Sequence, residues 1–322
     1  MTETIRWGIL GAANFAKTQM GPAIHLARNA TLAALATSST AKGAAFQDLF
    51  PELRLHDSYD ALLADPEIDA VYIPLPNHIH VTWTEKALAA GKPVLTEKPV
   101  GMSVAEVDQL IAARDASGCL AAEAFMILHH PQWHRAKQLV AEGAIGELVQ
   151  ICGAFTYDNR DMANIRNRAE TGGGGLRDIG VYPIGAARFI MGAEPVVDRV
   201  DVRWEEGVDT FVDATCHFGT VPFRFYVGTR AHLWQEMTFH GTSGVLRVSA
   251  PFNAVDFGPA QVHLLRPNKE AQTFAFHTDF QYVHQVEAFG HSLRTGAPYP
   301  VPLEFSRGTQ ALIDAIFDAA TA

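Results

Sequence analysis

Two short stretches of this sequence carry side chains that could transfer a proton. In "VLTEKPVGMSVAE", Glu97 and Lys98 follow the apolar end of a strand and precede a proline. In "TGGGGLRDIGVYPIGAARFI", Asp178 and Tyr182 follow a run of glycines and are four residues apart, so a helix from Leu176 would place both on one face. The simpler interpretations are a solvated turn for the first stretch, and a buried tyrosine with Asp178 as a helix cap for the second.

A third stretch, "WGILGAANFAK", lies where a strand turns into the first helix. Small residues occupy the three positions of the G-x-G-x-x-G/A fingerprint, which lets a pyrophosphate approach the helix N-terminus. The amide groups and the helix dipole would then bind the anion. The alternative is a tight turn without a ligand. The residues expected to bind the cofactor here are Gly11, Ala13, Asn14, Phe15 and Ala16.

The second strand ends without an acidic residue. An NAD site usually has an acid there to bind the ribose 2′-hydroxyl. This chain instead has the hydroxyls of Ser38 and Ser39, followed by Lys42. These groups favour the 2′-phosphate of NADP, so NADP is expected in preference to NAD; the alternative for Lys42 is an ordinary solvated lysine.

The stretch "IPLPNHIH" follows the next strand. Its prolines stiffen an extended turn, and Asn77 can cap the following helix. In a doubly wound sheet such a loop lies at the carboxyl edge, where ligands bind. No acid or thiolate stands near His78 and His80, so no metal site is expected. The cofactor-binding candidates in this loop are Leu75, Pro76, Asn77 and His80.

The elements that must position these residues change in type along the chain. Apolar runs alternate with amphipathic helical stretches through about residue 123, which predicts a parallel sheet covered on both faces. After a helix at Pro131–Glu142, long β-rich runs follow, with hairpin signals at Gly219-Thr220 and Thr242-Ser243-Gly244. We therefore predict an α/β protein. Residues 1–123 would form a Rossmann-type domain, and residues 124–322 an α+β domain with a large, mainly antiparallel open sheet.

Composition excludes several classes of function. The net charge of −10 argues against nucleic acid and against an anionic membrane surface, because both require a basic footprint. No apolar run reaches the eighteen or so residues that a membrane helix needs. The three cysteines are isolated and fit a reducing compartment. The first four residues lack the basic start of a signal peptide. A cytoplasmic protein is expected.

Taken together, these motifs resemble the glucose–fructose oxidoreductase / inositol 2-dehydrogenase / MocA-like family nearly end to end. The matching stretches are the glycine fingerprint, "EKP" at Glu97–Pro99, the "GGG…D-x-G-x-Y" signature at Gly173–Tyr182, "EAFM…HPQ" at Glu123–Gln132, "HGTSG" at His240–Gly244 and "EAFGHSLRTG" at Glu287–Gly296. Within the family, the chain looks most like the NADP-dependent D-xylose dehydrogenase and dimeric dihydrodiol dehydrogenase branch.

The resemblance implies roles for the first two stretches. Lys98 would lie at the carboxyl edge of the sheet beside the nicotinamide, in a turn whose proline is usually cis, and would polarise or protonate the substrate oxygen. Glu97 would orient Lys98 or close the cofactor pocket. Tyr182 would transfer the proton, and Asp178 would bind a neighbouring hydroxyl. Removing a hydride from a carbinol also requires a base for the hydroxyl proton.

The chain departs from the family at one place. An arginine usually follows "EAFMY", whereas Phe125–Leu128 is apolar here. The loop Tyr157–Arg168, which is dense in Asn, Asp and Arg, would suit a polyhydroxylated ligand instead, although it could be a plain surface loop. The substrate-binding candidates are Phe155, Asn164, Arg166, Arg168, Asp178 and Tyr182.

The expected activity is an NADP-dependent hydride transfer involving a sugar or cyclic polyol, with C1 oxidation of D-xylose or D-glucose to the lactone favoured. The alternatives are a reductase of an aldehyde, ketone or anhydro-sugar, a trans-dihydrodiol dehydrogenase, or a non-catalytic NADP-binding sensor. A homodimer or homotetramer is expected, formed through the open face of the C-terminal sheet.

Overall fold

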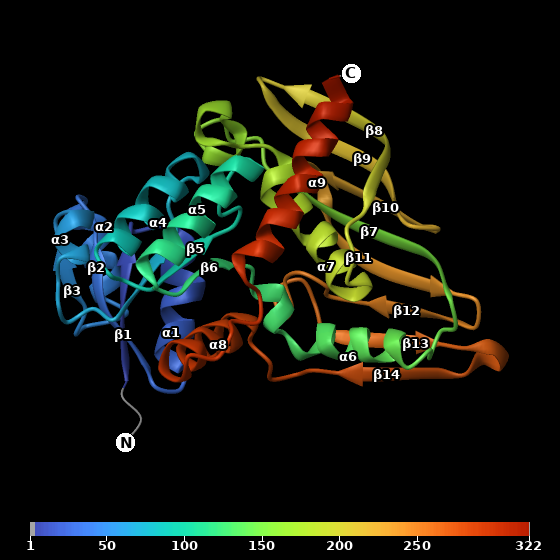
Figure 1. Ribbon diagram of the computed structural model, residues 1–322, viewed down its shortest axis with the longest axis horizontal. Helices are drawn as coiled ribbons and strands as arrows, with labels where there is room; N and C mark the ends of the chain where they lie inside the picture. Colours follow the sequence, from blue (N-terminus) through green and yellow to red (C-terminus); the bar gives the residue numbers. More distant parts are fainter. Residues whose placement is uncertain (1–3, 322) are drawn as a thin grey trace. The chain divides into compact units, whose positions relative to one another are not determined.

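The computed structural model describes residues 4–321, without the side chains of Lys269 and Thr321. The chain forms two compact units (Figure 1). The first unit extends to Met126 and also includes Tyr282–Arg307, and the second contains Ile127–Gln281 and the residues from Gly308 onward. Whereas the sequence pattern assigns everything after residue 123 to one domain, the segment Tyr282–Arg307 returns to the first unit.

The first unit is built on a parallel sheet with the order β3-β2-β1-β4-β5-β6, as expected of a Rossmann-type sheet. Its central strands are apolar and buried on both faces because helices cover them. The strand order reverses between β1 and β4, and in open sheets of this kind ligands bind at the carboxyl edge beside such a reversal. The strands are β1 (Ile5–Leu10), β2 (Ala30–Ala36), β3 (Arg54–His56), β4 (Ala70–Ile73), β5 (Val94–Glu97) and β6 (Ala121–Ala124).

Helices of the first unit begin where the sequence signals predict. Ser58 caps α3, Ser103 caps α5, and Gly118 ends α5 in the left-handed conformation. The first helical stretch differs from the expectation, because it begins with a π-helical turn, η1 (Ala16–Met20). The other helical elements are α1 (Gly21–Leu26), α2 (Thr40–Gln47), α3 (Tyr59–Leu63), η2 (Asn77–Ile79), α4 (His80–Ala89), α5 (Val104–Ser117) and α8 (Gln281–Thr295).

The second unit contains an eight-stranded sheet with the order β14-β13-β12-β11-β7-β10-β9-β8. Its strands pair antiparallel except for β7 with β10, and both predicted hairpins are present. Its strands are β7 (Leu148–Asp158), β8 (Val196–Glu205), β9 (Val208–Phe218), β10 (Val221–Gly228), β11 (Arg230–Gly241), β12 (Gly244–Val248), β13 (Gln261–Leu265) and β14 (Ala271–Ala275).

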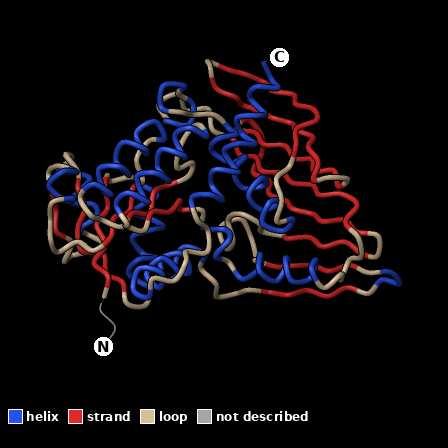
Figure 2. The backbone as a smooth tube through the Cα atoms, in the orientation of Figure 1, coloured by secondary structure: helices blue, strands red, loops and turns tan. Residues whose placement is uncertain are grey.

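Helices pack on one face of this sheet, as predicted for an open sheet (Figure 2). The elements that contact the sheet are α6 (Pro131–Ala141), η6 (Leu176–Gly180) and α7 (Val181–Met191). The other helical elements are η3 (Met126–His129), the short turns η4 (Ile165–Asn167) and η5 (Ala169–Thr171), η7 (Pro267–Lys269) in the turn between β13 and β14, and α9 (Leu303–Thr321), whose end lies in this unit. Trp133 of α6 is fully buried, and its indole N–H donates to the Pro251 carbonyl. No helix within residues 4–321 is long and apolar enough to cross a membrane.

Candidate active site

The turn after β1 has the close backbone approach that a phosphate site needs. Gly11 has φ of +101°, and a Cβ on it would come within 2.7 Å of a Leu75 methyl carbon. The Gly11 amide donates to the Ala36 carbonyl, which ties the turn to β2. Ala13 and Phe15 are half-buried, Asn14 is exposed, and Ala16 is buried at the start of the helix. A side chain at position 11 would therefore disturb this turn.

The loop between β2 and α2 carries the hydroxyls of Ser38 and Ser39, and Lys42 follows it in α2. Ser39 caps α2 by accepting from the Lys42 amide at 3.3 Å, so its hydroxyl hydrogen remains available to a ligand. Ser38 and Lys42 are exposed. Within residues 4–321, no carboxylate forms an ion pair with the Lys42 ammonium. The groups in this loop therefore fit a 2′-phosphate better than a ribose hydroxyl.

His80 is fully buried between two loops of the carboxyl edge. Its Nε2 lies 2.6 Å from the Leu75 carbonyl oxygen, and its Nδ1 lies 2.8 Å from that of Pro99. Burial lowers the pKa of His80. The two carbonyl oxygens act in the opposite direction, because both accept hydrogen bonds from a protonated imidazole ring. Pro76 and Asn77 begin the short turn η2, where they remain half-buried. We propose that His80 supports the two loops, and that Pro76 and Asn77 face the cofactor.

The turn that carries Lys98 is held from both sides. Glu97 ends β5, and its carboxylate accepts from the Tyr72 hydroxyl at 2.5 Å and from the Lys98 amide at 3.3 Å. Burial raises the pKa of Glu97. The Lys98–Pro99 peptide bond is cis, as the family resemblance implies.

A second acid secures the far side of the same turn. Glu123 on β6 accepts from the Val100 amide at 2.9 Å. Its side chain is buried, and it stands on the strand that pairs with β5. Sequence reasoning did not identify Tyr72 or Glu123. These contacts form only because neighbouring strands of the sheet pair, so no local pattern in the sequence identifies them.

In the second unit, Asp178 is the centre of a polar cluster. Its Oδ2 accepts from the Tyr157 hydroxyl at 2.7 Å and from Arg166 Nε at 3.0 Å. Burial, with Asp178 as the next cause, raises the pKa of Tyr157, so this phenol stays neutral and donates. The helix from Leu176 that would carry Asp178 and Tyr182 is present, and its first turn, η6, is π-helical. Such turns recur at functional sites.

Tyr182 lies in an aromatic cluster beside this polar one. Its ring centroid is 5.6 Å from that of Phe155 and 5.6 Å from that of Phe252. The Phe155 and Phe252 rings are stacked at 5.3 Å. The substrate-binding candidate Phe155 therefore lies next to Tyr182, and Phe252 is an additional member of the cluster.

The arginines of the loop Tyr157–Arg168 are paired with carboxylates. Arg160 pairs with Asp158, Arg166 with Asp178, and Arg168 with Glu170. The Asn164 side chain accepts from the Arg166 amide at 3.0 Å and so shapes the loop. Of the three candidates in this loop, Arg166 contacts Asp178, whereas Asn164 and Arg168 make local contacts.

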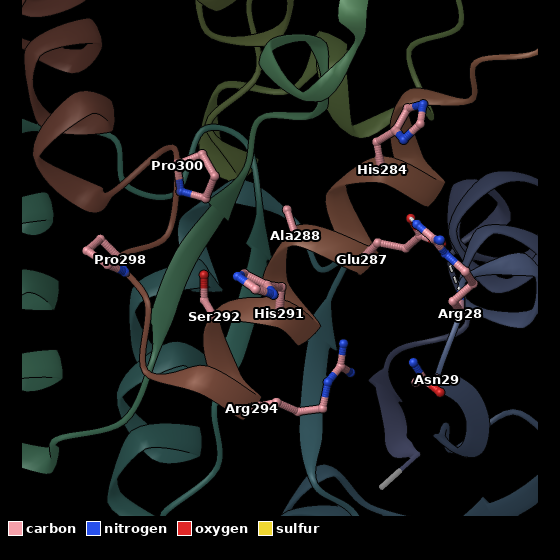
Figure 3. A pocket seen from close by; sticks show the side chains of 10 residues that line it. All are labelled: Arg28, Asn29, His284, Glu287, Ala288, His291, Ser292, Arg294, Pro298 and Pro300. Atoms are coloured by element: carbon pink, nitrogen blue, oxygen red, sulfur yellow. Dashed lines mark hydrogen bonds and ion pairs between the residues drawn. The ribbon is translucent and has the colours of Figure 1, made fainter. Parts of the chain in front are cut away.

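One cavity in the first unit is separate from these groups. It measures about 450 Å³ and is lined by α8 side chains together with Arg28, Asn29, Pro298 and Pro300 (Figure 3). The Asn29 carbonyl accepts from the Ile5 amide, so the cavity lies at the amino ends of β1 and β2. Arg28 forms an ion pair with Glu287 there. The cofactor candidates stand at the opposite edge of the same sheet. The described residues contain no group of three or more His, Cys, Asp or Glu that could hold a metal ion.

Known proteins share this architecture and much of the sequence. A 3-ketoreductase from Actinomadura kijaniata, solved in complex with NADP and TDP-benzene, matches with a TM-score of 0.92 and 30% identity over 98% of both chains. A D-xylose 1-dehydrogenase (NADP(+)) of Haloferax volcanii is 32% identical over 98% of this chain and 97% of its own. A dTDP-3,4-didehydro-2,6-dideoxy-alpha-D-glucose 3-reductase of Actinomadura kijaniata is 31% identical over 97% of this chain and 94% of its own.

Two family descriptions match the two parts of the chain. Residues 5–125 match the oxidoreductase family with an NAD-binding Rossmann fold, and residues 133–247 match the GFO/IDH/MocA C-terminal domain. These matches cover more than half of the sequence and agree with the two sheets. The chain is an oxidoreductase that belongs to the GFO/IDH/MocA family.

Proposed function

We propose that this protein transfers a hydride between NADP and a neutral pyranose or similar polyol, with C1 oxidation of D-xylose or D-glucose to the lactone as the favoured reaction. One observation carries the choice of a neutral sugar. Asp178 is held as an acceptor by Tyr157 and Arg166, while the arginines of the adjacent loop are paired with carboxylates. The loop thus offers hydrogen bonds and no unneutralised cation. A pocket built to bond hydroxyls strongly rejects analogues that lack them.

The residues present fit NADP as the cofactor. Gly11 gives the backbone approach that the pyrophosphate needs, and the helix N-terminus follows it. Ser39 and Lys42 supply a hydroxyl and an unpaired ammonium where an NAD site would have an acid. Named relatives that use or contain NADP support this assignment. When bound, the cofactor supplies the nicotinamide that accepts or donates the hydride.

The chain's own residues then handle the substrate and the proton. Tyr182 accepts the proton of the reacting hydroxyl, because the loss of a hydride from a carbinol carbon requires a base. An unperturbed tyrosine titrates near 10, so a nearby positive charge is needed to favour its phenolate. Lys98 polarises the substrate oxygen, and Asp178 accepts a hydrogen bond from a neighbouring hydroxyl. In the reverse direction the phenol of Tyr182 donates the proton.

The second candidate is the reduction of a keto-sugar carried on a nucleotide. It is supported by relatives named as 3-ketoreductases of dTDP-sugars, one of them 31% identical over 97% of this chain. Such a substrate brings a pyrophosphate with negative charge, and the pairing of Arg160, Arg166 and Arg168 leaves little to neutralise it. This charge balance favours the free sugar.

Initial rates with a matched set of substrates test the assignment. Purified protein is incubated with NADP⁺ and D-xylose, D-glucose, cyclohexanediol or an arene dihydrodiol, and separately with NADPH and a dTDP-keto-sugar, while reduced cofactor is followed by absorbance. We expect the highest kcat/KM for a free sugar. If the dTDP-keto-sugar gives the higher kcat/KM, the second candidate is correct. If a diol outperforms every sugar, the protein acts as a dihydrodiol dehydrogenase.

A matched pair of arginine variants tests the substrate contact. Arg166→Gln removes a charged hydrogen bond to Asp178, whereas Arg168→Gln removes a surface pair with Glu170. Hydrogen bonds to charged groups contribute about 1.5–3 kcal/mol, which corresponds to roughly ten- to hundredfold in KM for the sugar. Arg168→Gln should change KM less than about threefold. Equal effects of the two variants in steady-state kinetics would contradict a special role for Arg166.

A further inference from the structure

Asp209, at the start of β9, is a buried acid to which the proposed chemistry assigns no role. It is 1% exposed, and its Oδ2 accepts from the Leu176 amide at 2.6 Å. The backbone amides of Gly175 and of Asp209 itself also favour its ionised form. The guanidinium of Arg177 acts on it electrostatically. A carboxylate taken out of water at this depth is costly unless such donors surround it.

The helix that carries Asp178 and Tyr182 lacks a cap from its own segment. The residue at its N-cap position is Gly175, which has no side chain. The first amide groups of any helix have no partner within the helix and must be satisfied from outside it. Asp209 accepts from the Leu176 amide from a separate strand, and its carboxyl group lies at the positive end of the helix dipole.

The glycine run is required for this contact. A Cβ on Gly174 would overlap Asp209 Oδ1, and Gly174 has φ of +115°. The amide of Gly174 donates to the Arg166 carbonyl at 2.9 Å, and its carbonyl accepts from the Asp178 amide at 3.1 Å. One glycine thus connects the two residues that form the ion pair at the proposed sugar contact. Asp209 lies directly against it.

We infer that Asp209 is a positioning residue for substrate recognition: it caps the helix from β9, fixes the turn Gly174–Leu176, and thereby aligns Asp178 with Arg166. The inference rests on the proposed function in one respect, that Asp178 binds a sugar hydroxyl. A role in general stability alone would lower the stability of the whole second unit. If Asp209 has a positioning role, its loss should first loosen the turn Gly174–Leu176 and raise KM for the sugar.

The test uses Asp209→Asn at pH 8, where burial still leaves Asp209 ionised because its raised pKa is about 7. The substitution keeps the shape but removes the charge and one acceptor oxygen. The matched control is Asp213→Asn on the same strand, whose carboxylate pairs with Arg224 on the surface. Amide hydrogen exchange of the peptide that spans residues 172–182 is measured by mass spectrometry on the intact protein without substrate. We expect exchange in this peptide to accelerate about tenfold or more in Asp209→Asn and to stay at the wild-type rate in Asp213→Asn.

Kinetics provide the second readout. Asp209→Asn should raise KM for the sugar about tenfold or more, with a smaller change in kcat and an unchanged Kd for NADP(H). If Asp209→Asn does not fold, Asp209→Ser, which retains an acceptor oxygen, is measured in the same way. Unchanged exchange, or equal acceleration in the Asp213→Asn control, overturns the inference. So does faster exchange with an unchanged KM. Because exchange needs no substrate, a wild-type protein that oxidises no sugar would instead refute the proposed function.

Discussion

The proposed catalytic residue Lys98 is held in place by neighbouring residues that take no part in the proposed proton or hydride transfer. Lys98 stands in a turn fixed by Glu97 on one side and by the hydrogen bond from Val100 to Glu123 on the other. His80 contacts the carbonyl of Pro99 in the same turn. Catalysis benefits when a group is fixed in advance, because no free energy is then spent to orient it during the reaction. Substitutions of these supports should therefore affect turnover as well as stability.

Replacing the acid–base groups themselves should have the largest effect. Lys98→Ala or Tyr182→Phe is expected to lower kcat about a hundredfold or more, the usual contribution of a positioned acid or base. Tyr182→Phe should leave the Kd of NADP(H), measured by fluorescence titration, close to the wild-type value. Tyr226→Phe is a suitable control, because Tyr226 is 37% exposed on β10 and stacks on Phe211. Near-normal kcat in both site variants would remove the catalytic assignment.

At the scale of single elements, we propose that the loop between β2 and α2 sets the choice of cofactor. Lys42→Ala should weaken NADP(H) binding by about five- to tenfold at low salt and leave NAD(H) binding nearly unchanged, because only the former carries a 2′-phosphate. Ser38→Asp, which places an acid at the end of β2, should shift the preference towards NAD(H). Lys86→Ala on α4 serves as the control. Equal loss of both cofactors in Lys42→Ala would argue against a 2′-phosphate contact.

The contact between β9 and the start of the helix makes stability depend on pH. Burial raises the pKa of Asp209 from 3.8 to about 7. Between about pH 4 and pH 7 the folded protein therefore holds a proton that the unfolded chain has lost, so this group's contribution to the free energy of unfolding falls as pH rises through that range.

Urea unfolding at several pH values between 4 and 8 should show this slope as the difference between wild type and Asp209→Asn. Comparing the two proteins cancels the slopes of the other ionisable groups. A difference that is constant across the range would show that Asp209 does not titrate there.

Most helices and strands could be predicted because each is marked by a local pattern of apolar residues and turn signals. The hairpin predicted at Gly219-Thr220 is found between β9 and β10. The strand β3 was missed because its three residues, Arg54–His56, form no apolar run and lie at the edge of the sheet. The strands β13 and β14 were missed as well, and β14 alternates little between buried and exposed residues.

The candidate site was predictable only where a motif identified it. Gly11, Lys98, Asp178 and Tyr182 stand in recognisable patterns. In contrast, Asp209 is 33 residues from Leu176 in sequence and reaches it only through the fold of the sheet. The pairing of Tyr72 with Glu97 likewise depends on β4 lying beside β5. Contacts of this kind leave no local signal in a single sequence.

At the scale of the whole molecule, one face of the eight-stranded sheet remains to be covered. Helices pack on the other face, and Tyr226 and Arg224 of β10 are exposed. We predict that two copies associate through this open face, since a large uncovered β-surface favours association. Light scattering should give twice the 35.0 kDa chain mass or a higher multiple at micromolar concentration. Tyr226→Glu should shift the mass towards one chain, and a monomeric wild type would contradict the prediction.

The return of Tyr282–Arg307 to the first unit has a consequence for how the protein is made. Arg28 pairs with Glu287 across 259 residues, and the ring of Trp7 packs 5.1 Å from that of Phe289. A ribosome synthesises the whole second sheet between these partners. The emerging cofactor-binding half therefore keeps part of its core exposed until almost the entire chain has been translated, and a chain that stops after Met126 can never complete it. The half that is synthesised first is finished last.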